Sequence, residues 1–129
     1  MNSIVVDVWI FCDRLRDFLI RLSAVALLLT GALRANASNT SATIAQILFC
    51  GDCNLVYVYP TGGVQSAAPC QGTNGSYYSF AMTHTMAKEF VAALLAAQAR
   101  GATVLIVGTG DCRDQPNVSE TIAYFTVVS

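Results

Sequence analysis

The stretch LFCGDCNLVYVY places two residues between Cys50 and Cys53. This spacing suits a redox-active dithiol, one half of a zinc site, or a local disulfide. A redox dithiol normally lies where a strand leads into a helix, because the helix N-terminus lowers the pKa of the thiol. Strand-like residues flank this motif on both sides, so the sequence favours a disulfide across a tight hairpin turn over a redox site.

Other catalytic and metal-binding patterns have less support. A structural zinc site needs four ligands, usually in two pairs, but Cys70 and Cys112 stand alone in the sequence and the only histidine is His84. Nucleophilic hydrolysis would need an orienting acid beside His84, and the chain has no Gly-x-Ser-x-Gly motif. We therefore predict that the protein is not an enzyme and expect no cofactor and no metal.

The N-terminal third has the pattern of a secretory signal peptide. Three arginines between residues 14 and 21 precede the apolar run of residues 22–33, and Ala35-Asn36-Ala37 provides the small residues of a cleavage site. The run is shorter than the roughly 20 residues that cross a bilayer, which argues against a membrane anchor. We therefore predict an N-terminal extension and signal peptide over residues 1–37 and a folded domain over residues 38–129. The unusually long extension suggests that translation starts downstream, at Val8 or Leu15.

The expected mature domain carries three basic and five acidic residues, a formal net charge of −2. No basic cluster marks a nucleic-acid surface. Cleavage removes Cys12 and leaves four cysteines, an even number that predicts disulfides in a short exported chain and allows three pairings. We expect a secreted or periplasmic protein that has no membrane segment once the signal peptide is removed.

Hydrophobic periodicity predicts five strands and one helix in the mature domain. The helix lies in THTMAKEFVAALLAAQARG, with Thr83 or Thr85 as its cap and Gly101 at its end. Its alanines form a flat face that suits close packing on the sheet or on a partner subunit. The predicted strands are residues 43–49, 54–59, 77–81, 102–107 and 120–128.

The resulting order β-β-β-α-β-β predicts a mainly β domain with one helix. It is the order of the OB-fold, a five-stranded Greek-key barrel whose helix lies between strands three and four. An α+β sandwich with another topology is the alternative.

The run KEFVAALLAAQARGATVLIVGTGDC, followed by ETIAYFTV, resembles small exported bacterial proteins related to the B subunit of subtilase cytotoxin. These are similar to the receptor-binding B subunits of A-plus-five-B toxins, including typhoid toxin. The strand TIAQILF, the position of Cys70 and the Ser79-Phe80 pair fit the same pattern. The chain lacks the Trp-Thr-Tyr-Pro segment of those toxins, and Cys50 and Cys53 are additional.

The resemblance implies an OB-fold, a ring of five subunits with the helices around its pore, and recognition of sialylated or other cell-surface glycans. It also implies an enzymatic toxin subunit as a partner and a disulfide between Cys70 and Cys112. In those toxins a serine at the start of the first strand contacts the sugar, and the matching position here is Thr40 or Ser41.

A surface rich in tyrosines, hydroxyls and amides points in the same direction, because aromatic rings stack on the apolar faces of sugars. We therefore expect a glycan site that includes Thr40, Ser41, Tyr77 and Tyr78. The predicted function is that of a secreted, non-catalytic binding protein for a cell-surface glycan or a partner protein. The alternatives are a structural or inhibitory periplasmic protein without a sugar site, and a thiol oxidoreductase that uses Cys50 and Cys53.

Overall fold

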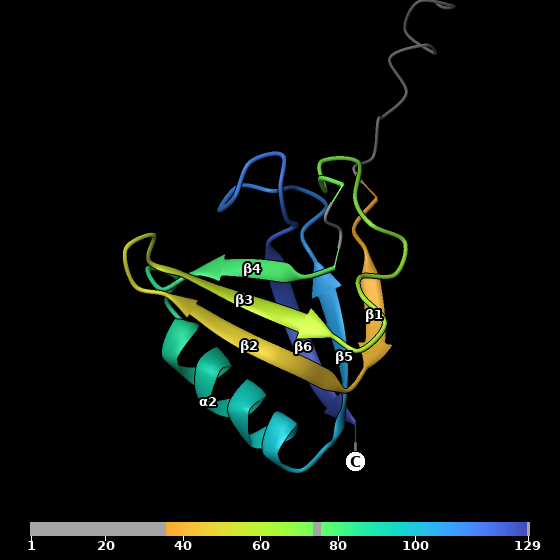
Figure 1. The fold of residues 1–129 in the computed structure, drawn as a ribbon, viewed down its shortest axis with the longest axis vertical. Helices are drawn as coiled ribbons and strands as arrows, with labels where there is room; N and C mark the ends of the chain where they lie inside the picture. Colours follow the sequence, from red (N-terminus) through yellow and green to blue (C-terminus); the bar gives the residue numbers. More distant parts are fainter. Residues whose placement is uncertain (1–35, 74–75, 129) are drawn as a thin grey trace, which may run out of the picture. The chain divides into compact units, whose positions relative to one another are not determined.

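Two three-stranded antiparallel sheets and one helix form the domain (Figure 1). The computed structural model describes residues 36–73 and 76–128, and all of its elements belong to the unit of residues 35–129. One sheet has the strand order β1-β5-β6 and the other has the order β2-β3-β4. The elements are β1 (Asn39–Ala42), β2 (Ile44–Cys50), β3 (Leu55–Pro60), β4 (Tyr78–Ala81), α2 (Ala87–Ala99), β5 (Thr103–Gly108) and β6 (Ile122–Val128).

The prediction of a mainly β domain with one helix is confirmed, with six strands where five were predicted. Within the described residues the strands form two separate sheets, and no closed barrel is detected. An isolated parallel bridge between Ser79 and Thr121 links the two sheets. The signal-peptide prediction concerns residues that lie, except for Asn36 and Ala37, outside the described part of the chain.

The extra strand arises because one extended segment serves both sheets. β1 pairs with β5, from Asn39 opposite Val107 to Ala42 opposite Val104, and β2 pairs with β3. Only Thr43 separates β1 from β2, so the chain changes sheets at a bend. The prediction of one strand over residues 43–49 missed β1, whose polar residues form a strand because β5 supplies their hydrogen-bond partners.

The hairpin between β2 and β3 carries the Cys-x-x-Cys motif. A turn over residues 51–54 joins the two strands, and Asn54 adopts a left-handed backbone conformation with φ of 55°. Cys50 and Cys53 form a disulfide whose Cα atoms lie 5.4 Å apart. The motif therefore lies between two strands, as the sequence predicts, and the helix begins more than 30 residues later, at Ala87.

The core lies between the two sheets and one face of α2. Val56 and Val58 of β3 are fully buried, as are Phe80 of β4 and Val104 of β5. The ring of Phe90 on α2 makes edge contacts with the rings of Phe80 and Phe125, at centroid distances of 5.7 and 5.1 Å. These contacts draw on both sheets and the helix, so the aromatic side chains fix how the three elements pack.

The helix ends as predicted and begins differently. Gly101 has a φ of 61°, and the N–H groups of Gly101 and Ala102 donate to the carbonyls of Gln98 and Ala97 at 3.0 Å, which is a Schellman ending. The predicted caps Thr83 and Thr85 do not cap it, because the helix starts after Met86 and has no side-chain cap.

The face of α2 that is rich in alanine is mostly turned to solvent. Leu94 and Ala97 are buried, whereas Ala92, Ala96 and Ala99 are exposed. Leu95 on the helix and Met86, which directly precedes it, are also exposed, at 42% and 53%. Within the domain, then, the sheets cover only the Leu94 side of the helix.

Candidate functional site

Three tyrosines gather on the outer face of the β2-β3-β4 sheet. Tyr57 and Tyr59 alternate along β3 with buried valines, so their side chains point away from the core. The ring centroid of Tyr77, which directly precedes β4, lies 5.2 Å from that of Tyr57 and 4.8 Å from that of Tyr59. We call Tyr57, Tyr59 and Tyr77 the tyrosine cluster. All three rings are half-buried and keep part of their surface in solvent.

Two glutamines hold the cluster in place. The Tyr77 hydroxyl donates to Oε1 of Gln115 at 3.2 Å, and Nε2 of Gln71 donates to the Tyr77 carbonyl at 2.8 Å. Burial, and then the neighbouring Tyr59, raise the pKa of the Tyr77 hydroxyl above its ordinary value. Tyr77 therefore stays neutral near pH 7 and remains a hydrogen-bond donor.

The four predicted glycan-binding residues divide between interior and surface. Thr40 and Tyr78 are fully buried, and Oγ1 of Thr40 lies 2.8 Å from the Tyr78 hydroxyl. Oγ1 of Thr40 also accepts the backbone N–H of Gln65 at 2.8 Å. Because these hydroxyls satisfy one another inside the domain, the two residues offer no surface to a sugar.

Ser41 and Tyr77 are the accessible members of the predicted set. Ser41 is exposed on the opposite face of β1 from Thr40, in the β1-β5-β6 sheet. Tyr77 belongs to the tyrosine cluster on the other sheet. Sequence reasoning left Tyr57, Tyr59, Gln71 and Gln115 outside the site. The alternation of tyrosine with valine in NLVYVY was the signal that two of the tyrosines share an outer face.

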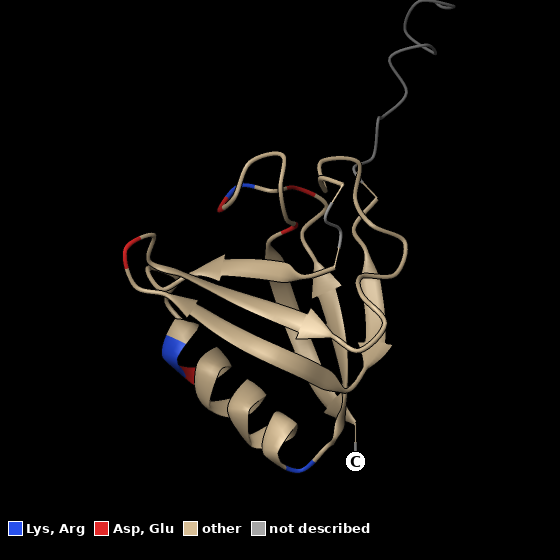
Figure 2. Ribbon diagram, in the orientation of Figure 1, with Lys and Arg blue, Asp and Glu red and all other residues tan. Residues whose placement is uncertain are grey.

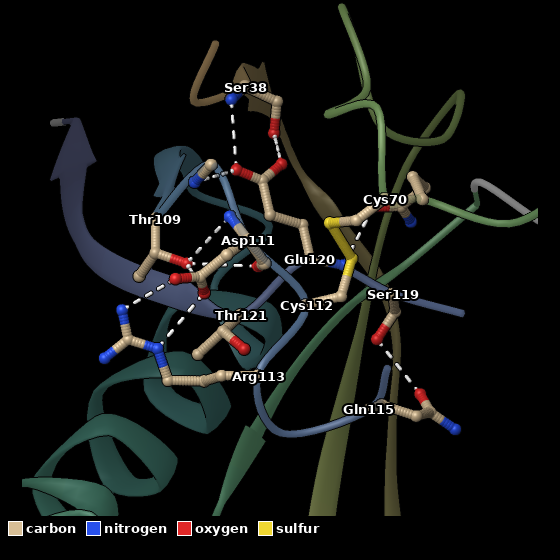
Figure 3. The surroundings of a disulfide bond; sticks show 12 residues. Ser38, Cys70, Thr109, Asp111, Cys112, Arg113, Gln115, Ser119, Glu120 and Thr121 are labelled. Atoms are coloured by element: carbon tan, nitrogen blue, oxygen red, sulfur yellow. Dashed lines mark hydrogen bonds and ion pairs between the residues drawn. A yellow bond between two sulfur atoms is a disulfide. The ribbon is translucent and has the colours of Figure 1, made fainter. Parts of the chain in front are cut away.

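The loops that carry Gln71 and Gln115 are joined by the second disulfide (Figure 3). Cys70 and Cys112, with Cα atoms 5.9 Å apart, form the pair implied by the resemblance. Oγ of Ser119 donates to Oε1 of Gln115 at 3.0 Å and lies 2.5 Å from Oγ of Ser79, within hydrogen-bond distance. This network fixes the loop over one end of the tyrosine cluster.

A buried carboxylate lies beside this disulfide (Figure 3). Glu120 is fully buried, and its Oε1 accepts the backbone N–H of Gly110 at 2.7 Å and that of Ser38 at 3.2 Å. Its Oε2 accepts the Ser38 hydroxyl. We call Ser38, Gly110 and Glu120 the Glu120 site. A Cβ atom on Gly108 would lie 2.1 Å from Oε1 of Glu120, so this strand end has room only for glycine.

Two aspartates in the loop that follows β5, Asp111 and Asp114, each contact a basic side chain. Nε2 of His84 is 2.9 Å from Oδ2 of Asp114, which also accepts the N–H of Ala81 at 3.0 Å. Arg113 binds Asp111 through both carboxylate oxygens, at 3.1 and 2.9 Å. Hydrogen bonds from Arg113 and Thr109 lower the pKa of Asp111 to about 2. These pairs brace the loop, and neither includes Glu120.

The charged side chains avoid the sheets (Figure 2). Among the described residues, no strand contains Asp, Glu, Lys or Arg, and their charges lie on the hairpin turn, near the ends of α2 and on the segment from Asp111 to Glu120. Large apolar side chains are exposed on two outermost strands: Leu48 and Phe49 on β2, at 36% and 53%, and Tyr124 and Val128 on β6, at 55% and 49%.

Among residues 36–73 and 76–128, no three His, Cys, Asp or Glu side chains converge to hold a metal ion. No helix in this described part is long and apolar enough to cross a membrane. Comparisons of the chain with protein-family models, with curated proteins and with solved structures found no match.

Proposed function

We propose that this protein is a secreted, non-catalytic binding domain that recognises a cell-surface glycan through the tyrosine cluster. The observation that carries the proposal is the grouping of Tyr57, Tyr59 and Tyr77 on one outer sheet face, with glutamine side chains at its rim. Aromatic rings present a flat apolar surface with a polar hydroxyl at the edge. A pyranose ring has the complementary chemistry, since its C–H groups form an apolar face and its hydroxyls surround it.

The arrangement of strands supports an OB-type domain of the kind found in toxin B subunits. The segment that bends at Thr43 runs through both sheets, as the first strand of such a barrel does. The Ser79–Thr121 bridge is parallel, and the N–H of Ser79 donates to the Glu120 carbonyl at 3.0 Å. These contacts join β4 to the start of β6, which would close a Greek-key barrel on that side.

A second copy of the chain is the partner that the outer strands fit best. β2 and β6 are each at the edge of a three-stranded sheet, and each exposes large apolar side chains without charge. Pairing β2 of one subunit with β6 of the next is a heterologous contact, which closes into a ring when the rotation permits. The proposed assembly is the ring of five implied by the resemblance, with an enzymatic subunit as its proposed toxin partner.

The two disulfides indicate an oxidising environment outside the cytoplasm. Together with the signal-peptide pattern, they support export of the protein to the periplasm or beyond. Light scattering of the exported product tests the assembly, and a monomer at micromolar concentration would count against the ring.

A glycan array that includes sialylated and fucosylated sugars tests the binding function on the exported, processed protein. We expect Tyr59→Ala to weaken binding to any sugar found on the array at least tenfold, which corresponds to about 1.4 kcal/mol. The control is Asn39→Ala, an exposed residue on β1 of the other sheet and outside the proposed contact between β2 and β6. Light scattering of both variants shows whether weaker binding results from loss of a sugar contact or from loss of the oligomer. Absence of binding to every sugar would contradict the proposal and favour a structural or inhibitory protein.

The exposed disulfide Cys50–Cys53 keeps the thiol oxidoreductase as a second candidate. The Tyr57 hydroxyl lies 3.2 Å from Sγ of Cys53 and donates to it, since a disulfide sulfur has no proton. Insulin reduction tests this function. Activity that Cys50→Ser abolishes and Cys70→Ser preserves would establish it in place of glycan binding.

A further inference from the structure

Within the described residues, the buried carboxylate of Glu120 accepts hydrogen bonds but has no cationic side chain as a partner. In the part of the chain that the structure describes, the ion pairs are His84–Asp114 and Arg113–Asp111. Burial of a carboxylate costs several kcal/mol unless hydrogen bonds and an opposite charge compensate for it. Three donors reach Glu120, and the backbone nitrogen of Ser38 is one of them, 3.2 Å from Oε1.

Ser38 is held firmly in this position. Its carbonyl accepts the N–H of Gly108 at 2.9 Å, and its hydroxyl lies 2.8 Å from that of Tyr78. Ser38 is fully buried, whereas Asn36 and Ala37 are exposed. The chain therefore passes from solvent into the domain at the Ala37–Ser38 peptide bond. This is the bond at which the Ala35-Asn36-Ala37 pattern predicts cleavage.

We propose that removal of the signal peptide after Ala37 creates the cationic partner of Glu120, the α-ammonium group of Ser38. In the hydrolysis, water adds to the Ala37 carbonyl carbon, the C–N bond breaks, and Ala37 leaves as a carboxylate. The Ser38 nitrogen keeps the bonding pair, gains a proton to become an amine, and takes up a second proton near neutral pH. The inference depends on the expected cleavage and not on any sugar-binding function.

The new charge strengthens a contact that the precursor already has. In the uncleaved chain the Ser38 N–H is a neutral donor, and after cleavage the same nitrogen makes a charge-assisted hydrogen bond, which is about twice as strong. The titratable groups that face this nitrogen are Glu120 and, through the Ser38 hydroxyl, Tyr78. Burial raises the pKa of Tyr78, so it remains neutral and does not compete for the charge. The mature domain is therefore more stable than the same domain with residues still attached.

The first test uses the full chain, exported and processed in the cell, and an identical chain with one threonine inserted between Ala37 and Ser38. Mass spectrometry of the product identifies its first residue. An α-amine-selective acylating reagent at pH 7 should then label the folded wild-type protein at least tenfold more slowly than the insertion variant, whose amine lies one residue outside. After unfolding, both should react at similar rates. A first residue other than Ser38, or equal labelling of the folded proteins, would overturn the proposal.

The second test combines Glu120→Gln with the inserted threonine in a double-mutant cycle. Either single change should raise the unfolding equilibrium constant at least tenfold in urea titrations. The double variant should lose less free energy of unfolding than the two single variants lose together, because each change removes the same ion pair. If the free-energy losses of the single variants add up to that of the double variant, the Ser38 ammonium and the Glu120 carboxylate do not form an ion pair, and the proposal is wrong. If Glu120→Gln fails to fold, the labelling comparison still decides the matter, since it needs no change at Glu120.

Discussion

The two disulfides connect the chain in different ways. Cys50 and Cys53 are three positions apart and close an exposed hairpin turn, whereas Cys70 and Cys112 are 42 positions apart and Cys112 is buried. In the chain-entropy description, loops of these sizes correspond to about 2 and about 4 kcal/mol of stabilisation. The short bond acts on a turn that its own strands already define. The long bond joins two loops that are far apart in the sequence and that are otherwise linked by hydrogen bonds, such as that from the Gly72 N–H to the Val118 carbonyl at 3.1 Å.

The surroundings of the two disulfides also differ, since one lies among local contacts and the other among contacts between distant parts of the chain. The hairpin is supported by a continuous ladder from Gln46 opposite Tyr59 to Cys50 opposite Leu55. The Cys70–Cys112 bond lies among side-chain contacts between residues far apart in sequence, such as Ser38 with Glu120 and Gln71 with the backbone N–H of Glu120. A change near Cys70–Cys112 should therefore spread through the domain, and a change in the hairpin should stay local.

The largest contrast should come from removal of each disulfide. We expect the double change Cys70→Ser and Cys112→Ser to lower the free energy of unfolding by about 4 kcal/mol, and Cys50→Ser with Cys53→Ser by about 2 kcal/mol or less. Urea unfolding of the two variants and the wild type measures both losses. Equal losses would remove the distinction between the two regions.

Replacement of a glycine by alanine should also affect the stability of the two regions differently. Gly108→Ala forces its Cβ against the buried Glu120 carboxylate, with an unrelaxed distance of 2.1 Å, and should cost about 1–3 kcal/mol as overpacking. Gly51→Ala in the hairpin turn meets nothing within 4 Å and should change stability by less than about 0.5 kcal/mol. Chemical denaturation of the two variants checks the pair, and a tolerated Gly108→Ala would contradict the close packing of Glu120.

Removal of single hydroxyl groups should give a smaller difference. Tyr78→Phe leaves the buried hydroxyls of Ser38 and Thr40 without a shared partner and should cost about 1–2 kcal/mol. Tyr57→Phe, beside the hairpin disulfide, loses only a partly exposed contact to a sulfur and should cost less. Thermal unfolding compares the two variants, and the reverse ranking would mean that the interior hydrogen bonds are worth less than their burial suggests.

Acid titration should produce the smallest effect. The pKa of Asp111 is about 2 in the folded protein against 3.8 without its partners, so the group stabilises the fold above pH 3.8 and this contribution disappears as the pH falls through 2. Both members of the Asp111–Arg113 pair are at least half exposed, so solvent and salt screen the effect. Comparison of Asp111→Asn with Asp52→Asn, its counterpart in the hairpin turn, by urea midpoints from pH 5 to pH 2 measures the contribution. An unchanged acid dependence in Asp111→Asn would contradict it.

Local patterns in the sequence were sufficient for most of the fold. Alternation revealed β3 and β6, helical spacing revealed α2, and Gly101 marked its end. β1 was missed because Asn39, Thr40, Ser41 and Ala42 have no strand-like pattern of their own, and their conformation comes from pairing with β5. The cap at Thr83 or Thr85 was wrong because the segment before Ala87 forms turns of its own, such as the bond from the N–H of His84 to the Ala81 carbonyl.

The candidate site was harder to predict because it depends on which way each side chain faces. Thr40 and Ser41 are adjacent, and a shift of one residue exchanges the buried position for the exposed one. Tyr77 and Tyr78 present the same ambiguity at the start of β4. The role of Glu120 was hidden for another reason, since its partners Ser38 and Gly110 are 82 and 10 positions away and no spacing rule connects them.

The order of the cysteines has a consequence for how the protein is made. A chain that enters an oxidising compartment amino end first presents Cys50 and Cys53 almost together, before Cys70 has emerged. Once these two are joined, Cys70 has no partner until Cys112 follows. Oxidation in order of emergence therefore yields the observed pairing among the three alternatives. The short disulfide adds less stability than the long one, yet its early formation prevents wrong pairings and removes the need for disulfide isomerisation.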